Sequence, residues 1–348
     1  MGIEAASVEE TYQQMRTKLS AVVPDFELKL KAELVYKINK LKRERGAIIL
    51  GHNYMEPALF HTVPDVVGDS LELSRKAATT QCDPIIFCGV RFMAETAKIL
   101  NPTRTVLLPA KVAGCSLAES ITADDVRKLR QTYPGVPIVT YINTYAEVKA
   151  ECDICCTSGN AAKVVESLKS DTIIFLPDEY LAKNVAHETG KKIFVAGRGG
   201  ALKPAASGYE MIGWEGRCEV HEKFSVEDIE NVRKQFPDVC VLAHPECSPE
   251  VIQASDFSSS TSYMSRFVKE HPKKQFLILT ECSMADNIIA DNPQSDVLRL
   301  CSIRCPHMNE ITLEDTLRSL TENVQKIELP EDLMNRARRS LERMLEVQ

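Results

Sequence analysis

The sequence of 348 residues has no basic cluster and no apolar run long enough to cross a membrane. Its apolar stretches, such as IIFCGV at 85–90, are strand-sized, whereas a transmembrane helix needs about 18 consecutive apolar residues. The N-terminus, MGIEAASVEE, is acidic and lacks the apolar segment of a signal peptide. Lys and Arg number 42 against 49 Asp and Glu, whereas nucleic acids are bound by clustered basic residues. We therefore expect a cytoplasmic protein that binds neither nucleic acid nor membrane.

The chain also lacks a low-complexity linker, although its length suggests two or three domains at roughly 100–200 residues each. Helical patterns are predicted over 8–46 and 311–348. Between them, short β-branched apolar runs alternate with amphipathic segments, which is typical of a parallel α/β fold. The predicted strands are 47–54, 84–92, 105–110, 137–144, 172–179, 192–197, 239–246, 275–281 and 297–301.

These strands form three copies of one unit, and an internal repeat of this kind predicts related domains. Each copy has a strand that ends in polar residues, then a hydroxyl residue that opens a helix, then a second strand and helix, and finally a cysteine. The polar strand ends are HNY at 52–54, YIN at 141–143 and HPE at 244–246, and the hydroxyl positions are Asp69-Ser70, Thr157-Ser158 and Ser260-Thr261. The second copy carries a Gly/Ala-rich insertion, 197–211, which we expect to be a loop.

Three related units around one axis would bring three sets of strand ends together, and ligands of open α/β sheets bind beyond the carboxyl ends of strands. Hydroxyls at helix N-termini favour anions, because unpaired N–H groups point at the ligand there. Ser70, Ser158 and Thr261 would then serve a substrate with several negative groups. The alternative is that they are ordinary helix caps.

The sequence has 12 cysteines, too sparse for a disulfide scaffold in a protein without a secretory signal. One per repeat, at matched positions, suits a [4Fe–4S] cluster that leaves one iron without a protein ligand, because such clusters prefer Cys thiolates. These are Cys115, Cys218 and Cys305. The alternative is that they are buried structural cysteines.

Other cysteines compete for a chemical role. Cys152 and Cys155 have redox-like C-x-x-C spacing followed directly by Cys156, although a predicted short strand there favours a buried role. Cys301 forms a C-x-x-x-C pair with Cys305. Cys247 follows Glu246 and is interpreted as an accessible thiol.

The polar strand ends also supply acid–base groups. His244 and Glu246 are two residues apart on an extended segment, so their side chains point to the same side, and such a pair suits proton transfer. Asp69, beside Ser70, is interpreted as a base or as a group that orients one.

From about residue 30 to the C-terminus, the chain resembles the quinolinate synthase family. The strings that carry the resemblance, in order, are GHNYMEP, GDSLELS, FCGVRFMAETAKIL, LLPAKVAGCSLA, TYINTYAEVKA, FLPDEYLAKN, WEGRCEVHEKF, LAHPECSPEV, SSSTSYM, CPHMNEITLEDTLRSL and NRARRSLERML.

The resemblance implies three αβα sandwich domains with parallel sheets, related by pseudo-threefold symmetry, with the cluster and the active site at their central junction. The expected domains are 1–115 together with the C-terminal helices of 306–348, then 116–218, then 219–305. It implies one [4Fe–4S] cluster per chain, held by the cysteine of AGCSLA, EGRCEVHE and CPHMN, namely Cys115, Cys218 and Cys305.

The implied reaction condenses iminoaspartate with dihydroxyacetone phosphate to give quinolinate, phosphate and water in NAD biosynthesis, with L-aspartate oxidase as a functional partner. The implied substrate-binding residues are His52, Ser70, Tyr141, Asn143, Ser158, His244, Glu246, Ser260 and Thr261. The expected catalytic residues are Glu246, His244, Tyr54, Tyr141 and Asp69. The residue after His52 is Asn53, where relatives frequently carry an aromatic residue or histidine.

Two other function classes share some of these features. An iron–sulfur hydro-lyase acting on another polycarboxylate would use the same open iron but would need no triose phosphate. A non-enzymatic iron–sulfur sensor would need a partner surface or a basic DNA-binding element, and the sequence offers neither.

Overall fold

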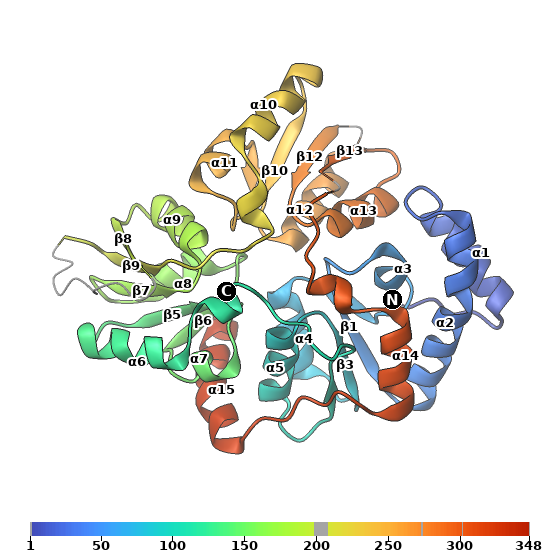
Figure 1. Ribbon diagram of the computed structural model, residues 1–348, viewed down its shortest axis with the longest axis horizontal. Coiled ribbons are helices and arrows are strands. Elements are labelled where there is room, and N and C mark those ends of the chain that lie inside the picture. Colours follow the sequence, from blue (N-terminus) through green and yellow to red (C-terminus); the bar gives the residue numbers. More distant parts are fainter. Residues whose placement is uncertain (1, 198–207, 273, 301, 348) are drawn as a thin grey trace.

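The computed structural model describes residues 2–347 apart from 198–207, 273 and 301. It has three parallel sheets with helices packed around them, and Figure 1 shows the three sheets arranged around a common centre. This is the α/β architecture with three αβα units that the sequence predicts. Of the helices in the described part of the chain, none is both long and apolar enough to span a bilayer.

The first and third sheets share one strand order, and the second adds a strand to it. The first sheet has the order β2-β1-β3-β4, with β1 Ile48–His52, β2 Val66–Gly68, β3 Ile85–Cys88 and β4 Val106–Leu107. The third has the order β11-β10-β12-β13, with β10 Cys240–Ala243, β11 Phe257–Ser258, β12 Gln275–Leu279 and β13 Asp296–Arg299. The second has the order β6-β5-β7-β9-β8, with β5 Ile138–Tyr141, β6 Ile154–Cys156, β7 Ile173–Leu176, β8 Ile193–Ala196 and β9 Met211–Trp214.

The extra strand, β8, lies at the edge of the second sheet, next to β9. The predicted loop 197–211 begins after β8 and reaches the first residue of β9, and its central part, 198–207, lies outside the described residues. The predicted strands are all present, but the sequence analysis missed β2, β9 and β11. The edge strands β2 and β11 are too short to give an alternating pattern, and β9 directly follows the insertion.

Helices follow the strands in each unit. Their bounds are α3 Pro57–Phe60, α4 Ser70–Thr79, α5 Arg91–Leu100, α6 Ala123–Thr132, α7 Ala146–Lys149, α8 Ala161–Ser167, α9 Glu179–Glu188, α10 Val226–Gln235, α11 Pro249–Ala254, α12 Thr261–Glu270 and α13 Cys282–Asp291. Short 3₁₀ turns are η1 Ala118–Ser120, η2 His221–Lys223 and η3 Met308–Glu310.

Both terminal helical regions are divided, where the sequence analysis expected continuous patterns. The first consists of α1 Val8–Leu19 and α2 Asp25–Glu44, with Pro24 as the N-cap of α2. Proline has no N–H for an intrahelical bond, so the helices separate before it. The second consists of α14 Leu313–Glu322 and α15 Glu331–Glu346, because Asn323 adopts a left-handed conformation and Pro330 caps α15.

One carboxylate in each unit clamps the start of the first strand to the edge strand beside it. Asp65 accepts a hydrogen bond from Ile49 N (2.9 Å), Asp153 from Ile138 N (2.7 Å) and Asp256 from Val241 N (2.8 Å). Each carboxylate also pairs with a cation of the preceding helix, and these cations are Lys42, Arg130 and Arg233. This repeated contact is direct structural support for three related units.

The first two units share a hydrophobic core, whereas the third has its own. A single cluster of buried side chains joins Ile49 and Phe87 of the first sheet to Val139 and Phe175 of the second, and Leu341 of α15 belongs to it. The third sheet packs its two faces into separate clusters of its own strands and helices. Because α15 contacts both α5 and α7, it ties the first and second units together. The domain boundaries themselves stay a prediction.

The Asp65 clamp generates a stability prediction. Replacing Asp65 with Ala removes the acceptor of Ile49 N and the partner of the buried Lys42 ammonium, so we expect a loss of about 2–3 kcal/mol of unfolding free energy. Denaturant unfolding of the isolated holoprotein measures it. Asp238→Ala, at an exposed position, is the matched control. Equal losses of unfolding free energy in the two variants would contradict a stabilising role of the Asp65 contacts.

Candidate active site

A cavity lies at the junction of the three sheets, where the carboxyl ends of β1, β5 and β10 meet. It is lined by all the predicted site residues except Ser260: His52, Tyr54, Asp69, Ser70, Cys115, Tyr141, Asn143, Ser158, Cys218, His244, Glu246, Thr261 and Cys305. His221, Thr157, Ser116, Glu219 and His307 also line it. The structure thus brings together side chains that are distant in the sequence.

The polar strand ends are structurally equivalent in the three units. In each sheet the last residue of β3, β7 or β12 pairs with a residue near the end of β1, β5 or β10. These residues of β1, β5 and β10 are Gly51, Thr140 and Ala243. The next residue in each unit is His52, Tyr141 or His244. Each forms a pair with the residue two positions later, which gives His52 with Tyr54, Tyr141 with Asn143, and His244 with Glu246. In parallel sheets these positions lie at one edge, so each unit presents one pair to the cavity.

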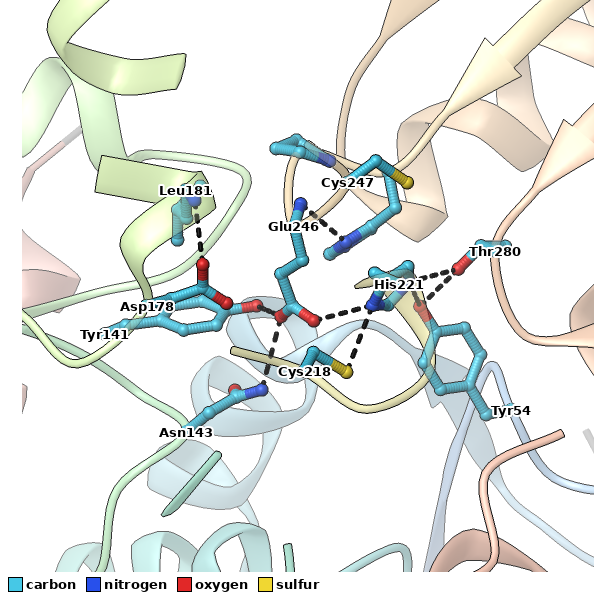
Figure 2. A network of polar contacts seen from close by, with 12 residues as sticks. Tyr54, Tyr141, Asn143, Asp178, Leu181, Cys218, His221, Glu246, Cys247 and Thr280 are labelled. Carbon is cyan, nitrogen blue, oxygen red and sulfur yellow. Dashed lines mark hydrogen bonds and ion pairs between the residues drawn. The ribbon is translucent and has the colours of Figure 1, made fainter. Parts of the chain in front are cut away.

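Glu246 is the centre of the polar network in Figure 2. Its Oε1 accepts hydrogen bonds from Tyr141 Oη (2.5 Å) and Asn143 Nδ2 (3.3 Å), and its Oε2 lies 2.8 Å from His221 Nδ1. Burial disfavours the charged form, but His221, His244 and these hydrogen bonds outweigh it and hold the pKa of Glu246 well below its usual range. Glu246 is therefore an ionised carboxylate buried among donors.

His221 is a central residue that the sequence analysis missed. Its ring is 1% exposed, and its Nδ1 lies between Glu246 Oε2 and Cys218 Sγ, 3.2 Å from the sulfur. On the other side of the ring, Nε2 lies 2.9 Å from Thr280 Oγ1 and 3.3 Å from Tyr54 Oη. The C-x-x-H spacing within EGRCEVHEKF was the available signal, because three residues on a helical turn bring two side chains to one side.

The two strand-end histidines are held as neutral donors. His52 Nδ1 accepts from Tyr54 N (3.2 Å), and His244 Nδ1 accepts from Glu246 N (3.4 Å), so in both rings the proton resides on Nε2. Burial lowers the pKa of His52 to about 4 and, together with the nearby His221, lowers that of His244 to about 3. Both residues therefore offer the cavity an Nε2–H and no positive charge.

The two phenols of the cavity are also kept protonated. Burial and the Glu246 carboxylate raise the pKa of Tyr54 and of Tyr141 well above the usual value. Tyr54 Oη lies 2.6 Å from Thr280 Oγ1, so it belongs to the same chain of polar groups as His221. Both phenols can donate a proton or a hydrogen bond.

Asp178, the N-cap of α9, is a second buried acid beside this network, and Figure 2 shows it next to Tyr141. Its Oδ1 accepts from Leu181 N (2.8 Å), and its Oδ2 has no hydrogen-bond partner among the described residues. Burial and the charge of Glu246 raise its pKa well above the usual range. The sequence placed Asp178 at a strand end but gave no sign that it lies behind the cavity.

The three predicted cluster cysteines lie in equivalent turns. Each precedes a 3₁₀ turn, and the carbonyl oxygens of Cys115, Cys218 and Cys305 accept from Glu119 N (3.0 Å), Glu222 N (3.0 Å) and Asn309 N (3.2 Å). Two backbone N–H groups of the same turn lie near each thiol and favour its deprotonated form. A hydroxyl N-cap follows at the same spacing in all three copies, at Thr122, Ser225 and Thr312.

This environment fits a metal cluster. Burial raises the pKa of Cys115 to about 12, that of Cys305 to about 11 and that of Cys218 well above its usual value. Without a metal these sites would hold neutral thiols, whereas coordination removes the proton outright, and the N–H donors then stabilise the thiolate. All three thiols line one cavity.

A smaller ligand set is also present. Ligand atoms of Cys218, His221 and Glu246 lie within 4.8 Å of one another. A thiolate, an imidazole and a carboxylate together also suit a single zinc ion. This set shares only Cys218 with the three predicted cluster cysteines, so metal analysis of cysteine variants separates the two sites.

The hydroxyl turns of all three units meet at the cavity. Asn53 Nδ2 of the first unit donates to Thr261 Oγ1 (2.9 Å) of the third, and a Cβ on Gly159 of the second would lie 3.5 Å from Ser260 Oγ. Ser70 and Thr261 are first residues of α4 and α12, as expected. Ser158 does not open a helix, because α8 begins at Ala161.

Two predicted residues have local roles in helix starts. Asp69 caps α4, where its Oδ1 accepts from Leu71 N (3.1 Å) and Glu72 N (3.0 Å). Ser260 is the N-cap of α12 and does not line the cavity. Their assignments as catalytic and substrate-binding residues stay predictions.

Of the other cysteines considered for a chemical role, four are buried and one lies outside the described residues. Cys247 is fully buried, so the interpretation as an accessible thiol is wrong; its sulfur points back toward Leu279 O. Cys152, Cys155 and Cys156 are buried, Cys155 and Cys156 within β6, as the predicted strand implied. Cys301 lies outside the described residues.

Comparison with known proteins gives one consistent result. The family profile described as "Quinolinate synthetase A protein" matches residues 36–346. "Quinolinate synthase 1" of Mesorhizobium japonicum is 50% identical over 328 residues, which are 94% of this chain and 95% of the relative. The "Quinolinate synthase" of Agrobacterium fabrum is 49% identical over 95% of this chain and 90% of its own length. The "Quinolinate synthase" of Xylella fastidiosa strain 9a5c is 52% identical over 89% of this chain and 86% of its own length.

Proposed function

This chain belongs to the quinolinate synthetase A family, and we propose that it condenses iminoaspartate with dihydroxyacetone phosphate in the central cavity. Its activity is that of a quinolinate synthase in NAD biosynthesis. The observation that carries the proposal for the site is the convergence of three cysteine turns and three polar strand ends on one cavity. The cytoplasmic location and the functional link to L-aspartate oxidase stay predictions.

Cys115, Cys218 and Cys305 would hold a [4Fe–4S] cluster, one from each crossover between units. Three equivalent thiolates satisfy three of its irons and leave the fourth open. When bound, such a cluster supplies a Lewis acid that polarises a substrate oxygen or nitrogen. The support from this chain is the matched geometry of the three turns and the N–H donors at each sulfur.

The anionic groups of the substrates would be bound by hydrogen-bond donors rather than by lysine or arginine. No Lys or Arg is among the described residues that line the cavity. Carboxylates and phosphate would instead meet Nε2–H of His52 and His244, the hydroxyls of Ser70, Ser158 and Thr261, and the N-termini of α4 and α12. Ser260 would support the turn that carries Thr261.

Proton transfer would centre on Glu246. Its carboxylate is ionised and two of its donors, Tyr141 Oη and Asn143 Nδ2, come from the neighbouring unit, so a substrate proton can move to Oε1 when Tyr141 turns to the substrate. Tyr141 would then protonate a leaving oxygen, with Asn143 orienting it. His244 would donate from Nε2 beside Glu246, and Asp69 would keep α4 in position.

His221 connects this carboxylate to Tyr54. With Nδ1–H donating to Glu246 Oε2, the ring accepts at Nε2 from Thr280 or Tyr54. In this polarity a proton can pass from Thr280 or Tyr54 to Nε2 while the Nδ1 proton passes to Glu246 Oε2, and Tyr54 faces the cavity. The chain would therefore return a proton to Glu246 once its own has gone to the substrate.

Metal analysis tests the ligands. We expect about four irons per chain in the anaerobically purified protein, and their loss in Cys115→Ala, Cys218→Ala and Cys305→Ala singly. Iron and sulfide content with visible spectroscopy measures this. Cys152→Ala, which removes another buried thiol, is the control and should keep the cluster. Zinc in place of iron, retained in Cys115→Ala and Cys305→Ala, would instead support the Cys218, His221 and Glu246 set.

Glu246→Gln tests the acid–base centre. The amide keeps the shape but cannot accept a substrate proton, so we expect the rate of quinolinate formation to fall by about 10²–10⁴-fold while the visible absorption of the cluster persists. Glu250→Gln, an exposed residue of α11, is the matched control. Turnover at the wild-type rate would remove Glu246 from the mechanism, and turnover without triose phosphate would favour a hydro-lyase.

A further inference from the structure

The third unit is joined to the first by polar contacts beside the cavity. The first and second units share a hydrophobic core, but the strands of the third pack into their own clusters. At the joint, Asn287 Nδ2 of α13 donates to Asn53 O (3.1 Å) and Met55 O (2.9 Å), just beyond β1. Directional hydrogen bonds therefore act at this joint, beside the apolar contact of Ala290 in α13 with the shared core.

The densest of these contacts involves the starts of α4 and α12. Ser262 Oγ accepts from Asp69 N (3.0 Å) and from Asn53 Nδ2 (3.2 Å), and it donates to Glu72 Oε2. Glu72 Oε2 also accepts from Asp69 N (3.3 Å) as part of the capping box of α4. A serine of the third unit thus completes the helix cap of the first.

The backbone is shaped to admit this contact. A Cβ on Gly68 would lie 2.5 Å from Glu72 Oε2 and 3.0 Å from Glu72 Cβ, so with a larger residue the Glu72 side chain would have to shift from its place over the helix start. Ser262 is half-buried and Glu72 is exposed, so the contact lies at the solvent edge of the joint. Its loss should leave the hydrophobic cores intact.

The same contact orients the hydroxyls that face the cavity. Thr261 Oγ1 accepts from Asn53 Nδ2, so its own proton is free to be donated to a ligand. Ser70 Oγ makes no hydrogen bond to the described part of the chain, and it lines the same cavity. At the start of α4, Asp69 occupies Leu71 N and Glu72 N, whereas Ser260 makes no side-chain cap at the start of α12, so the first N–H groups of α12 remain for a ligand.

We propose that Glu72 and Ser262 are positioning residues that fix the spacing of the α4 and α12 N-termini, so that Ser70 and Thr261 bind one anionic group of the substrate together. Asn53, which donates to both Thr261 Oγ1 and Ser262 Oγ, is the third member of this joint. The proposal rests on the proposed function. The anion is either the phosphate of the triose phosphate or a carboxylate of iminoaspartate.

Steady-state kinetics of Ser262→Ala under anaerobic conditions test it. We expect KM for one of the two substrates to rise about tenfold, the effect of losing a hydrogen bond to a charged group, while kcat stays within about threefold of wild type. A rise for dihydroxyacetone phosphate assigns the subsite to phosphate, and a rise for iminoaspartate assigns it to a carboxylate. Ser265→Ala, on the same helix, is the control. Unchanged KM values for both substrates would overturn the proposal.

Substitutions of Glu72 test whether Glu72 and Ser262 act together. Glu72→Ala should raise the same KM as Ser262→Ala, and the double variant should raise it by less than the product of the two single effects, because both substitutions remove the Ser262–Glu72 contact. Glu72→Gln keeps an acceptor oxygen and should lie nearer to wild type. Effects that multiply in the double variant, or a fall in kcat alone, would show independent roles and would contradict the proposal.

Two further measurements separate this proposal from the proposed function. Calorimetric titration with quinolinate and with inorganic phosphate reads the subsite without turnover, and binding of one of them should weaken about tenfold in Ser262→Ala. Equal affinities in the two proteins for both probes would overturn the positioning role. A wild-type protein that makes no quinolinate from the two substrates would overturn the proposed function instead, whatever the titrations give.

Discussion

The site depends on one buried charge, the carboxylate of Glu246. A carboxylate so fully removed from water would ordinarily take up a proton, because burial penalises its charged form. Here Tyr141 and Asn143 of the second unit and His221, beside Cys218, supply the donors that keep it ionised. Since these donors come from other parts of the fold, the charge exists only when the units are assembled. The acid–base chemistry of Glu246 therefore requires that the units are assembled.

The three units are not all joined in the same way. The first two units are joined through a common hydrophobic core that α15 completes, whereas the third adds Ala290 of α13 to that core and meets its neighbours through polar groups that include Asn287, Ser262 and Glu246. Apolar packing is strong but poorly directional, while hydrogen bonds specify position. The arrangement gives a firm platform of two units and a third whose orientation is set by a few polar groups at the edge of the cavity.

The sequence predicted much of this fold, because the repeat is encoded locally. Polar residues after apolar strands identified His52, Tyr141, His244 and their neighbours, and one cysteine per copy identified the three equivalent turns at the cavity. It missed His221, whose role depends on contacts with Thr280 and Glu246 that no spacing encodes. It also misjudged Cys247: the chain turns after His244, where Cys247 N donates to His244 O (2.9 Å), and the thiol is buried in the core of the third unit while Glu246 lines the cavity.

The sequence by itself determined the strand and helix pattern, the three-fold repeat and the family, since periodicity, caps and motifs are properties of neighbouring residues. Only the tertiary structure decided which groups are charged and which are donors. The neutral state of His52 and His244, the ionised state of Glu246 and the pairing of Ser262 with Glu72 follow from burial and from partners distant in the chain. Electrostatic energies depend on distance and on exclusion of water, and the linear order of residues specifies neither.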